Sequence, residues 1–333
     1  MKSSTARALV FGATMGFASL SGCADDAGKG APTDTLDDSL AFNEIAMRCT
    51  HNSYHIQQDF LLDPSHGYDH APLDVQLGEY GVRAFELDIH PGEGFPVLHI
   101  PMLDERSTCE NLETCLGVMA SWSKANPHHH MVVVWIEVKD ELHLSRQIDD
   151  YDALDAAIER GVGAGRLYRP SDFRRGHATL RDALDAEGWP TVGETRGRMM
   201  VVLLDTDAPH YEGYREGGRE GAMFSRARME DRFEPWAVVA KHDNPADVAN
   251  IQLALEANML VASNIGSAGS TYEHSQARLD AAVANGVHML CDDFPAPVEG
   301  QEYWLELPGW EPSTCNVVTA DADRCAALES VPE

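Results

Sequence analysis

The sequence has few basic residues and none of the glycine-rich motifs that bind nucleotide phosphates. Lysine and arginine number 25 against 54 aspartates and glutamates, a formal net charge of −29. So acidic a chain is a poor partner for nucleic acid, and it has no broad basic face for anionic membranes. No GxGxxG or Walker pattern occurs, and no cysteine or histidine spacing is typical of zinc.

A membrane-spanning run is also missing, but the N-terminus has another signal. The apolar stretch from Ala8 to Leu20 follows Lys2 and is short for a bilayer span. Leu20-Ser21-Gly22-Cys23 then reads as a bacterial lipobox. We therefore predict a lipoprotein signal peptide over residues 1–22 and lipidation at Cys23, with a core helix or another cleavage position as alternatives.

Residues 23–38 are small, polar and acidic, which predicts a flexible tether between the lipid and a folded body. Together with the signal peptide, the tether predicts an exported protein held at the bacterial cell envelope. It would face either the periplasm or the cell surface.

Short apolar strands alternate with amphipathic helices along the rest of the chain. The predicted strands are Ile45–Thr50, Arg83–Ile89, Met131–Val138, Met199–Asp205, Ala237–Lys241, Met259–Ser263 and His288–Asp292. The predicted helices include Asp150–Arg160, Leu180–Glu187, Ala246–Ala257 and Ser275–Ala284. Alternation implies a parallel sheet, and this many units indicate an α/β fold with a (β/α)8 TIM-type barrel, distorted or incomplete. We assign residues 39–310 to the barrel, residues 311–333 to a C-terminal extension, and expect a monomer.

Six cysteines remain after Cys23, and an even number in an exported chain suggests disulfides. Cys109–Cys115 and Cys315–Cys325 are the simplest local pairs. Cys49–Cys291 would join the first and last strands, although buried free cysteine is a common alternative.

Ionisable residues follow the predicted strands at their carboxyl ends, the rim that carries the active site in such barrels. They are His51, Asp88, Glu137, Asp205, His242 and Asp292. Strand alternation also puts Glu86 on the same face as Asp88. Because two like charges buried side by side are costly, we interpret this pair as ligands of a hard cation.

The residue types around this pair suit phosphodiester cleavage. Asn52, Glu86, Asp88 and Glu137 offer the oxygen ligands that Ca²⁺ prefers. A bound cation would neutralise a diester and acidify a neighbouring sugar hydroxyl. One of Glu86, Asp88 or His51 would accept the hydroxyl proton. A second histidine, His99, would protonate the leaving alcohol, since imidazole side chains can donate a proton near neutral pH.

Four short motifs carry a resemblance to a known family. They are T-H-N-S-Y from Thr50, E-L-D-I-H from Glu86, V-L-H ending at His99, and W-I-E-V-K-D from Trp135. This combination resembles the calcium-dependent bacterial branch of the phosphatidylinositol-specific phospholipase C superfamily, over roughly Phe42 to Pro295.

The resemblance implies a role for each matching residue. It marks His51 and His99 as catalytic and Asn52, Glu86, Asp88 and Glu137 as Ca²⁺ ligands. It implies a phospholipid substrate, cleaved to diacylglycerol and a cyclic inositol phosphate. Lys139, on the face of Glu137, would bind substrate, and so would Asp292, whose segment resembles the branch's last strand.

The sequence also departs from the branch. A late strand there usually ends in an Arg-x-Arg-x-Asp run, whereas residues 260–266 read LVASNIG. Lys139 or Lys241 would then supply the basic contact. Another diester, such as a glycerophosphodiester or a sphingolipid, is an alternative substrate, although the His-Arg-Gly and Glu-Asn-Thr motifs of glycerophosphodiesterases are absent. A catalytically inert surface binding barrel is a further alternative.

Single residues keep structural interpretations as well. His51 and His99 could be hydrogen-bonding histidines of loops, and Glu137 could pair with Lys139 at a solvated strand end. The run His128-His129-His130 most simply predicts a solvated loop.

Overall fold

The computed structural model describes residues 39–61, 63–139, 151–204, 208–215, 220–307, 309, 312–321 and 333. The predicted signal peptide, Cys23, the tether, Asp205 and Cys325 lie outside these residues. The chain divides into Met1–Pro32 and Thr33–Glu333, and the description below concerns the second unit.

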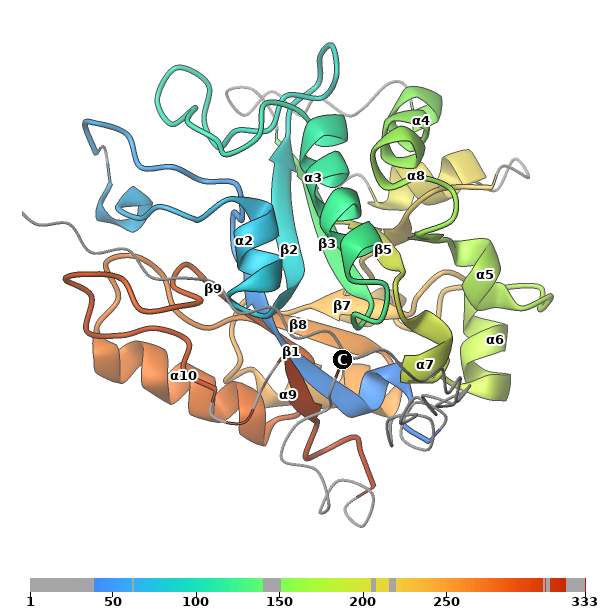
Figure 1. Cartoon of the computed structure of the whole chain (residues 1–333). Coiled ribbons are helices and arrows are strands. Elements are labelled where there is room, and N and C mark those ends of the chain that lie inside the picture. The colour runs from blue at the N-terminus through green and yellow to red at the C-terminus, as the bar shows by residue number, and fades with distance from the viewer. Residues whose placement is uncertain are drawn as a thin grey trace, which may run out of the picture. The chain divides into compact units, whose positions relative to one another are not determined.

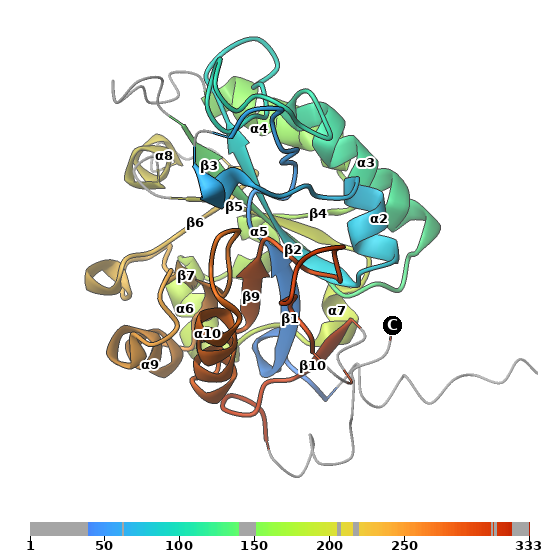
Figure 2. The ribbon, with the colours of Figure 1, turned by 90° about the vertical axis from the view of Figure 1, so that its left-hand side faces the viewer.

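The centre of this unit is a curled parallel sheet that confirms the predicted α/β, TIM-type fold in a distorted form. Its strand order is β4-β5-β3-β2-β1-β9-β8-β7. These strands are β1 (Ile45–Thr50), β2 (Val82–Ile89), β3 (Val132–Val138), β4 (Leu167–Tyr168), β5 (Met199–Leu203), β7 (Val239–Lys241), β8 (Leu260–Asn264) and β9 (Met289–Asp292). Figure 2 shows β1 between β2 and β9 at the middle of the curl.

The two ends of the curled sheet meet through a minimal contact. β6 (Phe224–Ser225) pairs with β5, and a single bridge joins Arg226 to Val239 of β7. β10 (Ser313–Cys315), within the predicted C-terminal extension, pairs antiparallel with β1. The barrel is therefore irregular where β6 and β7 adjoin.

Helices surround the outer side of the sheet (Figure 1). They are α2 (Leu73–Gly78), α3 (Leu112–Ala125), α4 (Tyr151–Val162), α5 (Pro170–Arg174), α6 (Leu180–Glu187), α7 (Val192–Thr195), α8 (Ala208–Arg215), α9 (Val248–Glu256) and α10 (Tyr272–Ala284). The four predicted helices correspond to α4, α6, α9 and α10. The prediction missed α3, whose first turn is capped by the side chain of Asn111 accepting from the Thr114 amide. No described helix is both long and apolar enough to cross a membrane.

Strand alternation divides the core into an inner and an outer part. Phe85 and Leu87 of β2 pack outward in one apolar cluster with helices α3 and α4, whereas Trp135 of β3 and Cys49 of β1 pack inside the barrel. The same alternation carries on to the carboxyl ends of the strands. It therefore turns His51, Glu86 and Glu137 toward the barrel axis.

Two of the three predicted disulfides are confirmed. Cys109 bonds to Cys115, and Cys49 of β1 bonds to Cys291 of β9. The latter ties together the two strands that lead into His51 and Asp293. The expectation of a solvated triple-histidine loop was wrong for two of its members, because His129 and His130 are buried and bonded to Ser123 and Ser313.

Candidate active site

Three carboxylates lie together at the carboxyl ends of β2 and β3. Asp88 is directly opposite Glu137 in the parallel ladder, and Glu86 precedes Asp88 on the same face. Carboxylate oxygens of all three lie within 4.8 Å of one another. Glu86 and Asp88 are fully buried. Three of the four predicted ligands are thus brought to one place, where unpaired negative charge would be strongly unfavourable.

Two lysines balance part of this charge. The Lys139 ammonium lies 2.8 Å from Glu137 Oε1 and 3.1 Å from Asp88 Oδ2, and Lys241 Nζ lies 2.6 Å from Glu86 Oε2. Burial raises the pKa of Glu137 to about 7, with Asp88 adding to the rise. Burial also opposes ionisation of Glu86, but the nearby cations Lys241, His51 and Lys139 together outweigh it and lower the pKa of that carboxyl.

The site has oxygen atoms that this arrangement leaves without partners. In the described part of the chain, Asn52 Oδ1 and Asp88 Oδ1 are buried and make no hydrogen bond. Asn52 holds a left-handed backbone conformation with φ of 43°, which asparagine tolerates better than most residues. Buried unsatisfied oxygens beside carboxylates fit a hard, oxygen-seeking cation such as Ca²⁺.

His51 lies at the end of β1, and its ring is held by a carboxylate that the sequence analysis did not select. His51 Nδ1 is 2.8 Å from Asp293 Oδ1. Burial alone would lower the pKa of His51, but Asp293 and, to a lesser degree, Glu86 raise it to about 9. His51 is therefore a cation at neutral pH.

Asp292, predicted to bind substrate, points away from this rim. Its oxygens accept from the Phe294 amide and the Tyr303 hydroxyl, and burial raises its pKa to about 7. Alternation explains the difference. Cys291 points inward to its disulfide with Cys49, so the next inward side chain is Asp293 and not Asp292.

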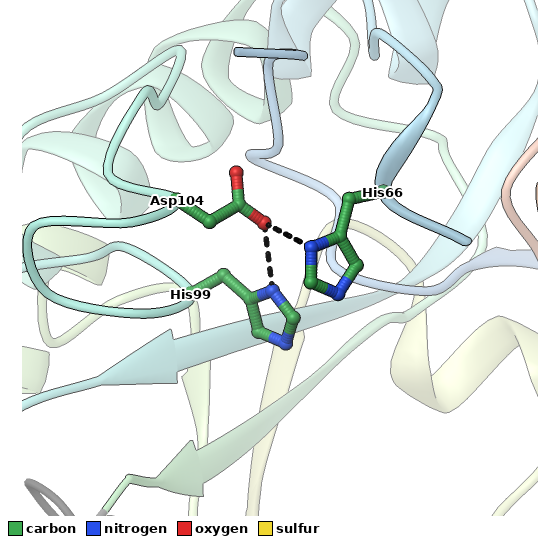
Figure 3. A group of neighbouring side chains, drawn as sticks. All are labelled: His66, His99 and Asp104. Carbon is green, nitrogen blue, oxygen red and sulfur yellow. Dashed lines mark hydrogen bonds and ion pairs between the residues drawn. The ribbon is translucent and has the colours of Figure 1, made fainter. Parts of the chain in front are cut away.

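His99 lies in the loop between β2 and α3 within a cluster of histidines around Asp104. Asp104 Oδ2 is 2.8 Å from His99 Nδ1 and 3.4 Å from His66 Nδ1 (Figure 3). His55 Nε2 is 3.0 Å from each oxygen of the same carboxylate. The sequence analysis missed Asp104 and His66, since neither follows a strand nor belongs to a recognisable motif.

A polar cavity of about 280 Å³ is lined in part by His51. Its lining comes from His51, Asp243, residues 264–267, Ser270, His274 and Arg278. Arg278 of α10 donates to the carbonyls of Asp243, Asn264 and Ile265. The Arg278 guanidinium therefore lies beside residues 260–266, the segment that itself contains no arginine.

Comparisons with known proteins give a family and a fold. The sequence model of the family "Phosphoinositide phospholipase C, Ca2+-dependent" matches residues 90–317, more than half of the chain. Two uncharacterised proteins of Mycobacterium tuberculosis are 30% identical over 156 residues, which cover 43% of this chain. The match spans only 32% of the length of those relatives.

Solved structures share the fold at low identity. A calcium-dependent phosphoinositol-specific phospholipase C from a Pseudomonas species superposes with a TM-score of 0.59, at 18% identity, over 80% of this chain and 94% of that one. A Ca²⁺-dependent phosphatidylinositol-specific phospholipase C from Streptomyces antibioticus gives 0.58 at 21% identity, over 77% and 96%. Identities this low show a common fold and leave substrate and mechanism to the site itself.

Proposed function

Because the chain belongs to the Ca²⁺-dependent phosphoinositide phospholipase C family, we propose that it cleaves phosphatidylinositol-type lipids to diacylglycerol and a cyclic inositol phosphate. The observation that carries this proposal is the group of three neighbouring carboxylates, Glu86, Asp88 and the half-buried Glu137. Two histidines accompany it, His51 and His99, and each ring is held by a carboxylate. That arrangement suits an intramolecular phosphoryl transfer with a separate proton donor.

The calcium ligands would be Asn52, Glu86, Asp88 and Glu137. The unpartnered oxygens of Asn52 and Asp88 support this assignment, and so does the mutual proximity of the three carboxylates. When bound, calcium supplies positive charge that neutralises the diester and increases the acidity of an inositol hydroxyl. Lys139, beside Asp88 and Glu137, is placed to bind a phosphate oxygen in the same region.

His51 would stabilise negative charge on the phosphoryl group. Asp293 occupies its Nδ1, which leaves Nε2 to donate a hydrogen bond to a phosphoryl oxygen. Because the raised pKa keeps His51 protonated at neutral pH, the hydroxyl proton would pass to Glu86 or Asp88 rather than to this ring.

His99 would complete the reaction as the general acid. The inositol oxygen bonds to phosphorus while the bond from phosphorus to the glycerol oxygen breaks, and that oxygen takes the proton from His99 Nε2. Asp104 holds Nδ1 and so fixes the orientation of the ring. We propose Asp104 and Asp293 as positioning residues.

The polar cavity beside His51 would hold the sugar head group. Its size of about 280 Å³ and its lining of hydroxyl, amide and imidazole groups suit a small polyol. The lipidation at Cys23, export to the cell envelope and a monomeric state accompany this proposal and rest on the sequence alone.

The proposal is tested with purified full chain and three substrates: phosphatidylinositol in vesicles, sphingomyelin in vesicles, and a water-soluble glycerophosphodiester. We expect phosphodiester cleavage of phosphatidylinositol only, with release of diacylglycerol. Cleavage should be abolished in His51→Ala and His99→Ala, with calcium affinity retained by both. His274→Ala, at an exposed cavity position, is the matched control and should alter KM more than kcat. Undiminished turnover by both catalytic variants would refute the mechanism, and turnover of another lipid alone would reassign the substrate.

A further inference from the structure

We propose that His66, His99 and Asp104 form a second metal site, which binds a zinc-type transition metal ion and, when filled, inhibits the enzyme through His99. The three residues converge in Figure 3, where one oxygen of Asp104 faces a ring nitrogen of each histidine. Binding stands on this geometry alone, whereas the inhibition rests on the function proposed above.

The distances within the group suit tetrahedral coordination. Donor atoms around a zinc ion with bonds of about 2.0–2.1 Å lie roughly 3.3 Å apart. Asp104 Oδ2 is 3.4 Å from His66 Nδ1 and 2.8 Å from His99 Nδ1, and all three ligand atoms lie within 4.8 Å of one another. Small rotations of the two rings would therefore place all three donors around one ion.

His66 makes ring contacts with His99 and His55, but it holds the Asp104 carboxylate only weakly. Its 3.4 Å separation from Asp104 is longer than an ordinary N–H···O hydrogen bond, so it adds little to holding the carboxylate. That task falls to His55, which is buried, contacts both oxygens of Asp104 and bonds to the Tyr68 carbonyl. His55 thus resembles the outer partner that orients a metal-ligating carboxylate.

Solvent access to the three side chains also favours a metal site at this position. The side chains of His66 and His99 are 20% and 18% exposed, whereas Asp104 is buried at 1%. Solvent therefore reaches the donors from one side and leaves a fourth position open for water. His66 ends the short 3-10 helix Pro64–His66, which is capped by Asp63 accepting from the Ser65 amide.

The ligand chemistry separates this site from the calcium site. Two imidazole nitrogens and one carboxylate suit Zn²⁺ and similar divalent ions such as Ni²⁺ and Cu²⁺, whereas Ca²⁺ prefers oxygen ligands alone. Among the described residues, these are the two groups of potential metal ligands that lie close together. Saturating calcium should accordingly leave the histidine site free for zinc.

Filling the site would remove the general acid. A metal at Nδ1 of His99 takes the position of the proton that now faces Asp104. The ring then holds one proton, on Nε2, and giving that proton to the leaving alcohol would produce an imidazolate. Proton donation is strongly disfavoured in that state, so turnover should stop while calcium and substrate still bind.

The test is calorimetric titration of ZnCl₂ into the full chain in saturating calcium. The wild type should bind one zinc ion that His66→Ala binds at least about 100-fold more weakly, since loss of an outer partner alone typically costs 10- to 100-fold. His128→Ala, an exposed histidine that precedes β3, is the matched control and should bind zinc like the wild type. Equal zinc affinity in the wild type and His66→Ala would overturn the site.

Turnover of phosphatidylinositol vesicles is then measured against added zinc. Zinc should inhibit the wild type and not His66→Ala, whose activity without zinc should match the wild type. Zinc that binds the wild type without slowing it would overturn the inhibition. If no variant cleaves any lipid but the difference in zinc affinity persists, the metal site stands and the proposed function fails.

Discussion

Replacement of Asp293 by asparagine should shift the pH dependence of the enzyme through His51. Asp293 raises the pKa of His51 to about 9 although burial lowers it, so its removal should return that pKa to 6.5 or below. At pH 8 about nine-tenths of His51 is protonated in the wild type, against roughly one part in thirty in Asp293→Asn. If the protonated ring stabilises the phosphoryl charge, activity at pH 8 should fall about 30-fold and recover in large part near pH 5.5.

The same substitution should destabilise the fold in a pH-dependent way. A histidine whose pKa rises on folding contributes stability in full below its unfolded pKa of 6.5, and loses it as the pH rises through 9. The rise corresponds to at most about 3 kcal/mol, reduced by solvent screening because the His51 side chain is 31% exposed. Asp293→Asn should therefore cost more unfolding free energy at pH 6 than at pH 10.

The assays are kcat/KM against pH and an NMR titration of the His51 ring, assigned with His51→Gln. Asp292→Asn is a natural control, because that carboxylate faces Tyr303 and the Phe294 amide instead of His51. A basic limb that stays near pH 9 in Asp293→Asn would refute the role given to this carboxylate.

Three other predictions follow from the site and the fold. Because burial raises the pKa of Glu137 to about 7, calcium must displace a proton there, and calorimetric calcium affinity should fall about 10-fold from pH 8 to pH 6. Removal of the Cys49–Cys291 disulfide, whose cysteines are 242 residues apart, should cost about 5 kcal/mol in denaturant unfolding, against about 2 for Cys109–Cys115, six apart. Phe60 and Met102 are 76% and 82% exposed, on the loops after β1 and β2, and should enter the lipid. Replacement of both by serine should therefore lower turnover of lipid in vesicles about 10-fold and leave turnover of a monomeric short-chain lipid unchanged.

Each of these predictions has a control and an opposing outcome. Glu137→Gln should bind calcium more weakly, and its calcium affinity should depend little on pH. If the pH dependence were unchanged in this variant, the proton that calcium displaces would not be on Glu137. Equal losses from the two disulfides would contradict the loop-closure reasoning. Phe233→Ser, an exposed phenylalanine before β7, should leave vesicle turnover unchanged, and an equal loss there would mean that the effect is not specific to the rim.

The regular part of the fold was predictable because its strands carry their own signal. Runs such as Val132–Val138 are apolar on both faces, as parallel strands inside a barrel must be, so β3 was located to within a residue. α3 was not among the predicted helices, because Gly117 and Cys115 weaken its helical pattern. Its local signal is the N-cap Asn111, and its apolar side chains belong to one cluster with residues of β2 and β3.

The candidate site was predictable where it depends on alternation along one strand, and not where loops create it. Glu86 and Asp88 share a face by the geometry of β2 alone, and neighbouring Glu137 follows from strand order. Whether Asp292 or Asp293 faces the barrel axis depends on the alternation along β9. Because Cys291 must point inward to reach Cys49, Asp293 and not Asp292 is the next inward side chain. Asp104 reaches His66 through tertiary folding of two loops, for which no local pattern exists.

The most direct test of the account follows phosphorus NMR of phosphatidylinositol vesicles mixed with the full chain, with calcium or with a chelator. The account predicts the resonance of a cyclic inositol phosphate in calcium alone, absent in the chelated sample and in His99→Ala. Cleavage that proceeds equally with the chelator, or a product that is never cyclic, would contradict a calcium-dependent intramolecular reaction at this rim.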